Sequence, residues 1–241
     1  MKKTIISCVL FLTAVTAFSQ TTMKTAAEAK LSASDLAVKI ADRILATTTY
    51  EFKNAKTGKT YKSVKDLPLD MNVKVACKYN NWHYTNGVTH IALMELADKT
   101  GAKKYDDYVL KNMNFVFNEG NLDFFKKQYD QAMKDEGWYG VRKLSWHMIF
   151  RGKRLDDNGP MGASLIDLQM KHPNNSFLNY INETAEHLNY GEPRLADGTI
   201  ARIWPHENTI WADDAFMAIS FLARMAKMTG DMNYINDAAN H

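Results

Sequence analysis

The sequence contains only two cysteines, and this alone removes several kinds of site. Cys8 lies in an N-terminal apolar run, and Cys77 is the one cysteine that follows it. A single cysteine forms no internal disulfide and argues against a thiolate metal site on spacing grounds. No two histidines stand three or four residues apart, and there is neither a glycine-rich phosphate loop nor a serine elbow motif. We therefore expect no metal and no cofactor.

The chain also has a small net charge and no apolar run long enough to span a bilayer. The formal net charge of +3 falls to +1 if Lys2 and Lys3 leave with an N-terminal segment. A chain so close to neutrality gives no case for nucleic acid or an anionic membrane as a partner. The apolar run over residues 5–18 follows these lysines and precedes Ser19 and Gln20. At about 14 residues it is too short to span a bilayer and has the pattern of a secretory signal.

We therefore expect cleavage near Ser19 and Gln20, with residues 1–19 as the signal peptide and residues 20–241 as the mature domain. The protein is then secreted or periplasmic and is not membrane-bound after the signal is removed. A remainder of about 220 residues is long enough for one domain with a substantial core.

Helical periodicity dominates the rest of the chain. Apolar spacing and capping residues predict helices from Ser34 through Ile44, over residues 88–99, 105–117, 160–170, 176–187 and 208–228, and from Asp231 onward. Short β-hairpins are expected only within residues 49–62 and 199–204. The sequence therefore predicts an all-α protein.

An internal repeat indicates how these helices pack. Thr100-Gly101 and Tyr105 recur as Thr229-Gly230 and Tyr234, at an offset of 129 residues. Repeated helical hairpins must stack on one another, in an open solenoid or a closed ring. We expect a closed toroid, with the apolar helices 88–97 and 215–226 inside and the amphipathic helices 105–117 and 176–187 outside.

Two pairs of adjacent acids stand out in this helical background. One lies in Trp211-Ala212-Asp213-Asp214-Ala215-Phe216-Met217. With a helix that begins at Asn208, Asp213 lies past the first turn and faces the core, and Asp214 points about 100° away. Trp204 and Trp211 are then expected to raise the pKa of Asp213, as a general acid requires. The alternative is that both acids simply favour the first turn of a helix.

The second pair lies in Arg154-Leu155-Asp156-Asp157-Asn158-Gly159-Pro160-Met161-Gly162. Its Asp-Asn-Gly-Pro segment is also ordinary turn chemistry before a helix start. Asp157 precedes Asp213 by 56 residues, which is the length of one helical hairpin. Because stacked hairpins bring successive inner-helix starts to the same rim, both acid pairs are expected to face one cavity.

Aromatic and nitrogen-bearing side chains surround the starts of three inner helices. Indole faces stack on sugar rings, and arginine or histidine suits a carboxylate. The candidate substrate-binding residues are Asp156, Trp211, Trp82, His83, Trp146, His147, Arg202, His206 and Asp214. Each taken alone is explained better by packing, and it is their clustering at three helix starts that favours a sugar site.

These motifs resemble those of the unsaturated uronyl hydrolases, glycoside hydrolase families 88 and 105, and are more similar to family 105, the unsaturated rhamnogalacturonyl hydrolases. The resemblance rests on the two acid motifs, on Trp82-His83-Tyr84-Thr85-Asn86-Gly87 and on the Thr-Gly turns, from about Leu36 onward. It implies an (α/α)6 barrel of twelve helices, of which about seven or eight are predicted here, so we expect a truncated copy. It also implies that Asp213 is the general acid/base and that Asp157, or else Asp156, is the second acid.

The resemblance further implies the substrate and the reaction. The substrate is an oligosaccharide that ends in a 4,5-unsaturated uronic acid, a product of pectin-type lyases. Asp213 would protonate C4 of the enol ether, and water deprotonated by the same residue would add at C5. The resulting hemiketal opens and releases the remaining sugar. Asp157 would orient ring hydroxyls, and Arg202 or His206 would meet the uronate.

Two alternatives remain open at this point. One is a conventional inverting glycosidase on the same barrel, similar to some α-mannanases, which requires two carboxyl groups about 6.5–9.5 Å apart. The other is a helical carbohydrate-binding protein in which the acids bind hydroxyls without turnover.

Overall fold

The computed structural model describes residues 32–117, 120–152 and 154–241. The predicted signal peptide therefore lies outside the described residues. Contacts divide the chain into a unit of residues 1–43 and a unit of residues 44–241, and the fold described below is that of the second unit. None of the helices in the described residues combines the length and apolar character needed to cross a bilayer.

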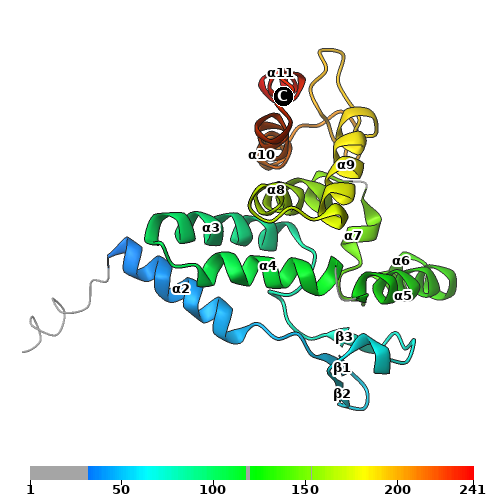
Figure 1. Ribbon diagram of the computed structural model, residues 1–241. Coiled ribbons are helices and arrows are strands. Elements are labelled where there is room, and N and C mark those ends of the chain that lie inside the picture. The colour runs from blue at the N-terminus through cyan, green and yellow to red at the C-terminus, as the bar shows by residue number, and fades with distance from the viewer. Residues whose placement is uncertain (1–31, 118–119, 153) are drawn as a thin grey trace, which may run out of the picture. The chain divides into compact units, whose positions relative to one another are not determined.

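The second unit is helical apart from one small sheet, as the sequence predicts (Figure 1). Its long helices are α3 (Tyr84–Thr100), α4 (Lys104–Phe117), α5 (Asn121–Glu136), α8 (Leu155–Lys171), α9 (Asn175–Tyr190) and α10 (Ala212–Thr229), and α11 (Asn233–Asn240) is shorter. Helix α2 (Ala33–Thr47) runs across the division between the units, and α6 (Trp138–Val141), α7 (Met148–Arg151) and the 3-10 helix η1 (Val64–Asp66) are single turns. Helix α5 is absent from the sequence prediction.

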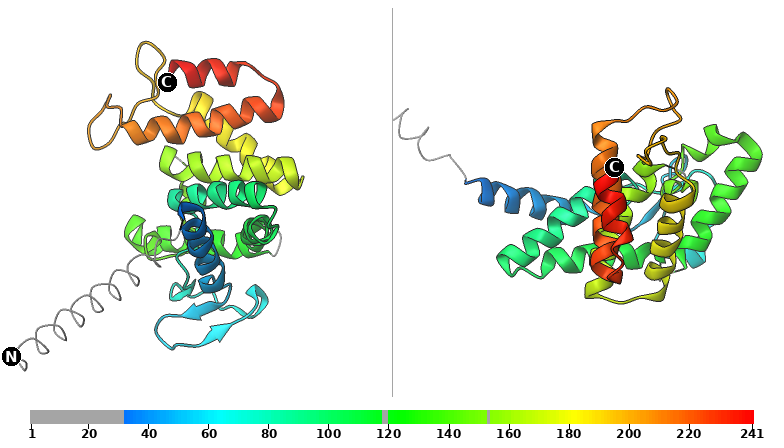
Figure 2. Two further views of the ribbon diagram at one scale, coloured as in Figure 1. Left: turned by 90° about the vertical axis from the view of Figure 1, so that its left-hand side faces the viewer. Right: turned by 90° about the horizontal axis from the view of Figure 1, so that it is seen from above.

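Three helical hairpins follow one another in the unit. Helices α3 and α4, α8 and α9, and α10 and α11 pack as pairs, and α8 contacts both α3 and α10. Figure 1 and the left view of Figure 2 place α8 between α3 and α10, with α9 beside α8. Helices α3, α8 and α10 therefore form one layer, in agreement with the inner helices that the sequence predicts.

Two glycines allow the helices of this layer to approach through their backbones. A Cβ on Gly87 of α3 would collide with the backbone of Pro160 in α8. A Cβ on Gly159 of α8 would lie 2.6 Å from the carbonyl oxygen of Met217 in α10. Both glycines are buried, and both lie close to the N-terminal ends of their helices. The spacing of the three helix starts is therefore set by contacts of the main chain.

A three-stranded antiparallel sheet in the order β2-β1-β3 precedes α3. Strand β1 (Phe52–Asn54) pairs with β2 (Thr60–Tyr61), as the hairpin prediction requires, and also with β3 (Val73–Val75), which was not predicted. Phe52 is 1% exposed and packs against Phe115, Phe124 and Phe125. This aromatic cluster attaches the sheet to α4 and α5.

A buried histidine lies between α3 and α4. His90 is 2% exposed, and its Nε2 atom is 3.4 Å from Asn112 Nδ2. The Nδ1 atom of His90 and the Oδ1 atom of Asn112 are buried without a hydrogen-bond partner in the described residues. Burial lowers the pKa of His90 from its ordinary value of 6.5 to about 4.

Acidification is therefore expected to destabilise the fold between about pH 6.5 and pH 4. In this window the unfolded chain binds a proton at His90 that the folded chain excludes, so the free energy of unfolding falls as pH falls, by about 3 kcal/mol in total. Urea unfolding of the His90→Gln variant should show a smaller decrease across this window than the unchanged chain. His172→Gln, at the exposed end of α8, is the control. Equal pH dependence in all three proteins would contradict the assignment.

Candidate active site

The acid pair of α10 lies in the first helical turn. Helix α10 begins at Ala212 rather than at Asn208, so both Asp213 and Asp214 belong to that turn. Asp214 is 3% exposed and shares its helix face with the buried side chains of Met217 and Phe221. Asp213 is exposed, on the same side as Phe216, which is 49% exposed. The prediction that Asp213 faces the core is therefore wrong, because the buried face of α10 runs through Asp214, Met217 and Phe221, about 100° from Asp213.

Arg202 holds Asp214 in place. Its Nε and Nη2 atoms donate to the two carboxylate oxygens of Asp214 at 2.5 and 2.6 Å, and Nη2 lies 3.8 Å from Asp156 Oδ1. The guanidinium also lies over the Trp211 ring, with its Cζ atom 4.1 Å from the centroid. The hydrogen bonds to Asp214 raise the pKa of Arg202, and the charges of Asp156 and Asp213 raise it further. Arg202 therefore links the starts of α8 and α10.

An isolated bridge explains why α10 starts late. Residues Arg202 and Thr209 form an antiparallel bridge, in which the Arg202 N–H donates to the Thr209 carbonyl at 2.8 Å. This pairing keeps the segment before Trp211 out of the helix. It also places Arg202 beside the first turn of α10.

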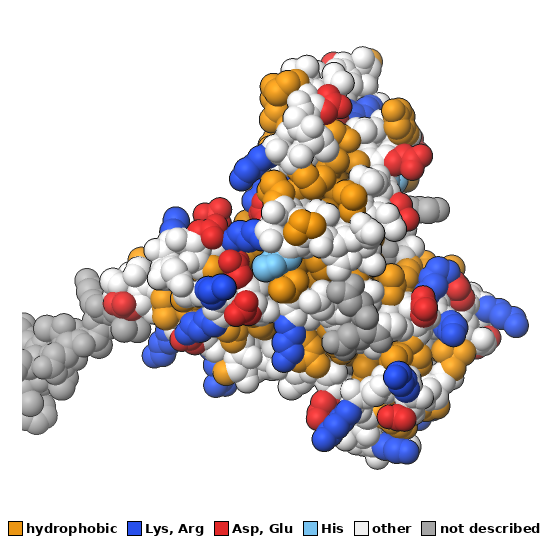
Figure 3. Space-filling view, in the orientation of Figure 1, with side chains coloured by type: hydrophobic (Ala, Val, Ile, Leu, Met, Phe, Trp, Pro, Cys, Tyr) orange, Lys and Arg blue, Asp and Glu red, His pale blue; other side chains and the backbone are white. Residues whose placement is uncertain are grey.

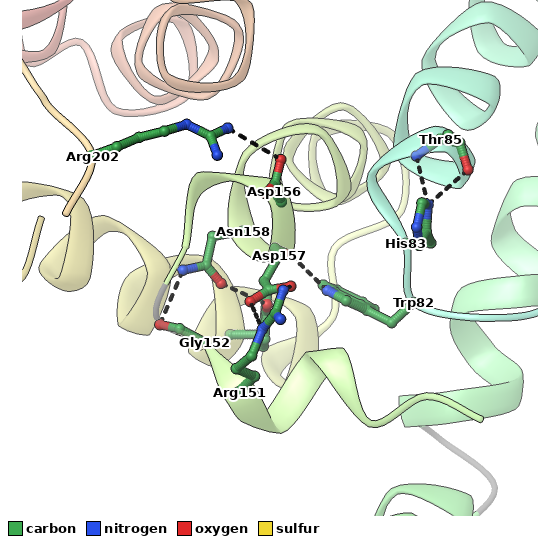
Figure 4. A network of polar contacts seen from close by, with 10 residues as sticks. Trp82, His83, Thr85, Arg151, Gly152, Asp156, Asp157, Asn158 and Arg202 are labelled. Atoms are coloured by element: carbon green, nitrogen blue, oxygen red, sulfur yellow. Dashed lines mark hydrogen bonds and ion pairs between the residues drawn. The ribbon is translucent and has the colours of Figure 1, made fainter. Parts of the chain in front are cut away.

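The acid pair of α8 is likewise inside the helix. Helix α8 begins at Leu155, five residues before the predicted start at Pro160. Asp157 is 0% exposed, and Nε and Nη2 of Arg151 contact its two carboxylate oxygens. Trp82 Nε1 donates to the Asp157 carbonyl at 2.7 Å (Figure 4). Burial raises the pKa of the Asp157 carboxyl, against the opposite effect of Arg151. Asp157 is thus enclosed, and the expectation that it faces a cavity is wrong.

Asp156 is the acid of this pair that is open to a ligand. Its side chain is 27% exposed and points toward Arg202, away from the Arg151–Asp157 pair (Figure 4). One step along a helix turns a side chain by about 100°, which separates the enclosed Asp157 from Asp156.

A cavity of about 610 Å³ lies beside these helix starts. It is bordered by the end of α9, the loop after it and the first turns of α8 and α10. Its lining residues are Arg154, Leu155, Asp156, His187, Gly191, Glu192, Pro193, Ala201, Arg202, Ile203, Trp204 and Asp214. Asp156 and Asp214 thus share one cavity, whereas Asp213 and Asp157, the two acids expected to react there, are not among its lining residues.

Two of the predicted sugar-stacking residues belong to the core. Trp82 and Trp146 are both 0% exposed. Trp82 packs edge-on against Tyr180 at a centroid distance of 4.8 Å, and Trp146 stacks on Phe125 at 5.9 Å. Neither indole presents a face to solvent, so their prediction as stacking residues is wrong. The large apolar area of an indole is explained here by packing.

The three histidines of the prediction lie in different environments. His83 caps α3 by accepting from the Thr85 N–H, and burial lowers its pKa although Asp156 and Asp157 raise it. His147 is 8% exposed, and burial lowers its pKa as well. His206 is exposed in the loop before α10. None of the three borders the cavity.

Nine of the lining residues were not among the predicted site residues, and four of these nine carry an ionisable or aromatic side chain: Arg154, His187, Glu192 and Trp204. Arg154 is exposed, and its guanidinium lies over the Trp204 ring, with its Cζ atom 5.6 Å from the centroid. Trp204 is 60% exposed. His187 and Glu192 lie at the end of α9, where the helical pattern of the sequence gave no reason to expect a site. Arg154 could have been found, since it stands at the head of the second acid motif.

Acidic and basic side chains are interspersed over the face shown in Figure 3. Within the described residues, no group of three or more His, Cys, Asp and Glu side chains is arranged to hold a metal ion.

Comparisons with known proteins give a family match and two similar solved structures. A family model described as Glycosyl Hydrolase Family 88 matches residues 53–241. A possible member of the GH105 family from Salmonella enterica serovar Paratyphi A matches with 14% sequence identity and a TM-score of 0.49, over 87% of this chain and 47% of that one. A possible GH105 member from Klebsiella pneumoniae matches with 13% identity and a TM-score of 0.49, over 87% and 46%. No curated protein sequence matches. The chain spans about half the length of these solved structures.

Proposed function

Since the chain belongs to Glycosyl Hydrolase Family 88, we propose that it is a glycoside hydrolase that removes a terminal 4,5-unsaturated uronic acid from pectin-type oligosaccharides. The proposed preferred substrates are the oligosaccharides that rhamnogalacturonan lyases produce. We also propose that the reaction takes place outside the cytoplasm, because residues 1–19 have the pattern of a secretory signal.

One observation carries this proposal. The first turns of α8 and α10 bring Asp156 and Asp214 to one cavity, and Arg202 contacts both carboxylates. Acids, arginines and an exposed indole around a cavity suit an anionic sugar, whose carboxylate needs a cation and whose ring needs a flat apolar face.

Asp213 is the proposed proton donor. It is exposed at the start of α10, two residues after Trp211 and outside the lining of the cavity, and its charge acts on Arg202; its role is proposed from its place in the motif. Protonation of C4 of the enol ether leaves positive charge on C5 and the ring oxygen. Asp213, now ionised, deprotonates the water that adds at C5, and the hemiketal opens to release the remaining sugar. Asp156 faces the cavity and is the proposed acid that offsets the positive charge, in place of Asp157.

Arg154 is the proposed partner of the uronate carboxylate. Arg202 already gives two of its nitrogens to Asp214, whereas Arg154 is exposed at the cavity and lies over Trp204. A guanidinium can bind a carboxylate through two parallel hydrogen bonds. His206 lies outside the cavity lining, so the uronate is assigned to Arg154 in this proposal.

The double bond provides the direct test. Incubation with an unsaturated uronyl-rhamnose disaccharide should abolish its near-ultraviolet absorbance as water adds to the alkene. Release of reducing sugar from saturated mannan, with the absorbance of the disaccharide unchanged, would instead identify a conventional glycosidase. Binding of the disaccharide without either signal would identify a carbohydrate-binding protein.

Trp211→Ala is expected to weaken substrate binding. Trp211 is 43% exposed and is held beneath the Arg202 guanidinium, so its free face is available to a sugar ring. Its loss should raise KM roughly tenfold, which corresponds to about 1.4 kcal/mol of binding free energy. Tyr190→Ala removes an aromatic that is 85% exposed at the end of α9 and serves as the control. An unchanged KM for the Trp211 variant would show that the indole has only a structural role.

A further inference from the structure

The turn that ends α9 brings two ionisable side chains together. His187 Nε2 lies 3.0 Å from Glu192 Oε1, and the Glu192 backbone N–H donates to the His187 carbonyl at 3.0 Å. The side chain of Glu192 is 7% exposed and that of His187 is 21% exposed. Both residues line the cavity beside Asp156 and Asp214. The Glu192 carboxyl is therefore fixed on the cavity wall and largely removed from water.

The two arginines whose charges affect Glu192 are each paired with another carboxylate. The charges of Arg194 and Arg202 reach Glu192, but Arg194 pairs with Asp237 at 2.6 Å and Arg202 pairs with Asp214 at 2.5 Å. Among the described residues, the basic side chain within ion-pair distance of the Glu192 carboxylate is therefore His187. His187 is a counter-charge only when it is protonated. Beside a neutral imidazole an enclosed carboxylate is costly, so the neutral acid is favoured.

The titration of this carboxyl follows from these surroundings. Burial raises the pKa of Glu192 to about 7, and the charges of Asp214 and Asp157 contribute in the same direction. Arg194 and Arg202 act in the opposite sense. At neutral pH a large fraction of Glu192 therefore carries a proton and can donate a hydrogen bond, whereas an ionised carboxylate would repel an anionic ligand.

We propose that Glu192 is a further substrate-binding residue of this cavity, which donates a hydrogen bond from its carboxyl to an oxygen of the bound sugar acid while His187 fixes its position. This inference rests on the proposed function, because it takes a uronic acid as the ligand. Binding of the sugar acid then requires the proton on Glu192. Affinity should decrease above pH 7, approaching about tenfold for each pH unit.

Calorimetric titration with the saturated disaccharide galacturonosyl-rhamnose, which has no double bond to hydrate, tests this inference. Between pH 7 and pH 9 the unchanged chain should lose affinity steeply. Glu192→Gln keeps a hydrogen-bond donor but has no proton to lose, so its affinity should stay nearly constant over this range. Glu186→Gln, an exposed acid on α9, should follow the unchanged chain. A Glu192→Gln variant that still loses affinity in parallel with the unchanged chain would overturn the proposal, as would a flat profile for the unchanged chain.

A second measurement needs no variant and covers the case in which Glu192→Gln does not fold. At pH 7.5, binding should be accompanied by uptake of a large fraction of one proton, seen when the apparent binding enthalpy is compared in buffers of different ionisation enthalpy. Binding without proton uptake would contradict the role of Glu192. The two proposals can fail independently. If the unsaturated disaccharide keeps its absorbance while the saturated one binds with proton uptake, the proposed function is wrong and the role of Glu192 stands. Absence of any binding of the saturated disaccharide would overturn the role of Glu192 only, since the proposed function is decided by the absorbance of the unsaturated disaccharide.

Discussion

Asp213→Asn is expected to abolish turnover of the unsaturated disaccharide while leaving the fold intact. An amide neither gives its proton to C4 nor takes one from water, so the loss of activity should exceed about a thousandfold, within the range that general acid–base groups contribute. Because Asp213 is exposed, its replacement leaves no buried group without a partner. The measurement is the rate of loss of near-ultraviolet absorbance, together with far-ultraviolet circular dichroism to verify helical content.

Glu207→Gln is the matched control for this prediction. Glu207 is also an exposed acid in the segment before α10, but it has no proposed part in the reaction. It should retain the activity of the unchanged chain. If the Asp213 variant also turns over substrate at a comparable rate, another acid of the site must supply the proton.

The second large effect concerns stability. Arg151→Met should lower the free energy of unfolding by about 3–5 kcal/mol, because it leaves the carboxylate of Asp157 buried without its counter-charge. Methionine retains much of the side-chain volume beside Trp138, over which the guanidinium lies at 5.2 Å. The loss is measured by urea unfolding. Arg142→Met, at an exposed arginine nine residues earlier, should change stability very little.

The pH dependence of the Arg151 variant distinguishes charge from packing. Without Arg151, the folded chain holds a proton on Asp157 at pH values where the unfolded chain has already lost it. The deficit should therefore shrink as pH falls toward 4 and be largest at neutral pH. The double variant with Asp157→Asn should recover part of the lost stability. A deficit that is independent of pH would indicate that packing, and not the buried charge, is responsible.

The sequence was sufficient to predict the helices and their layers, because both depend on apolar periodicity along the chain. The sequence was insufficient to predict the residue at which α8 and α10 begin. Residues 208–211 have the signals of a helix start, but the bridge between Arg202 and Thr209 keeps them extended. That pairing is not local. The exposures expected for Asp213 and Asp214 are exchanged for another reason, which is that the buried face of α10 runs through Met217 and Phe221 and not through Phe216.

The start of α8 was missed for a related reason. Asp-Asn-Gly-Pro is normally a turn, but here Arg151 engages Asp157 and the helix continues through Pro160. Helix α5 could have been predicted, since Phe124, Gln128 and Ala132 recur every four residues on its buried face. Glu192 could not, because its role depends on burial at a cavity formed by segments distant in the chain.

The residue types also did not determine which of the tryptophan side chains are buried and which are exposed. Trp82 and Trp146 stand beside helix starts just as Trp204 and Trp211 do, yet the first two are enclosed and the last two are exposed. An indole has enough apolar area to favour either place. Only the packing of α4, α5 and α9 around the first two tryptophans separates these cases.

The backbone contacts at Gly87 and Gly159 have a consequence for how proteins of this kind diverge. Main-chain atoms change little when neighbouring side chains are replaced, so the separation between the acids at the two helix starts is insulated from drift elsewhere. The connection between α9 and α10, which lines the cavity, makes no such backbone contact at these two glycines. Under the proposed function, substitutions there are expected to alter sugar preference while the acids at the helix starts keep their separation.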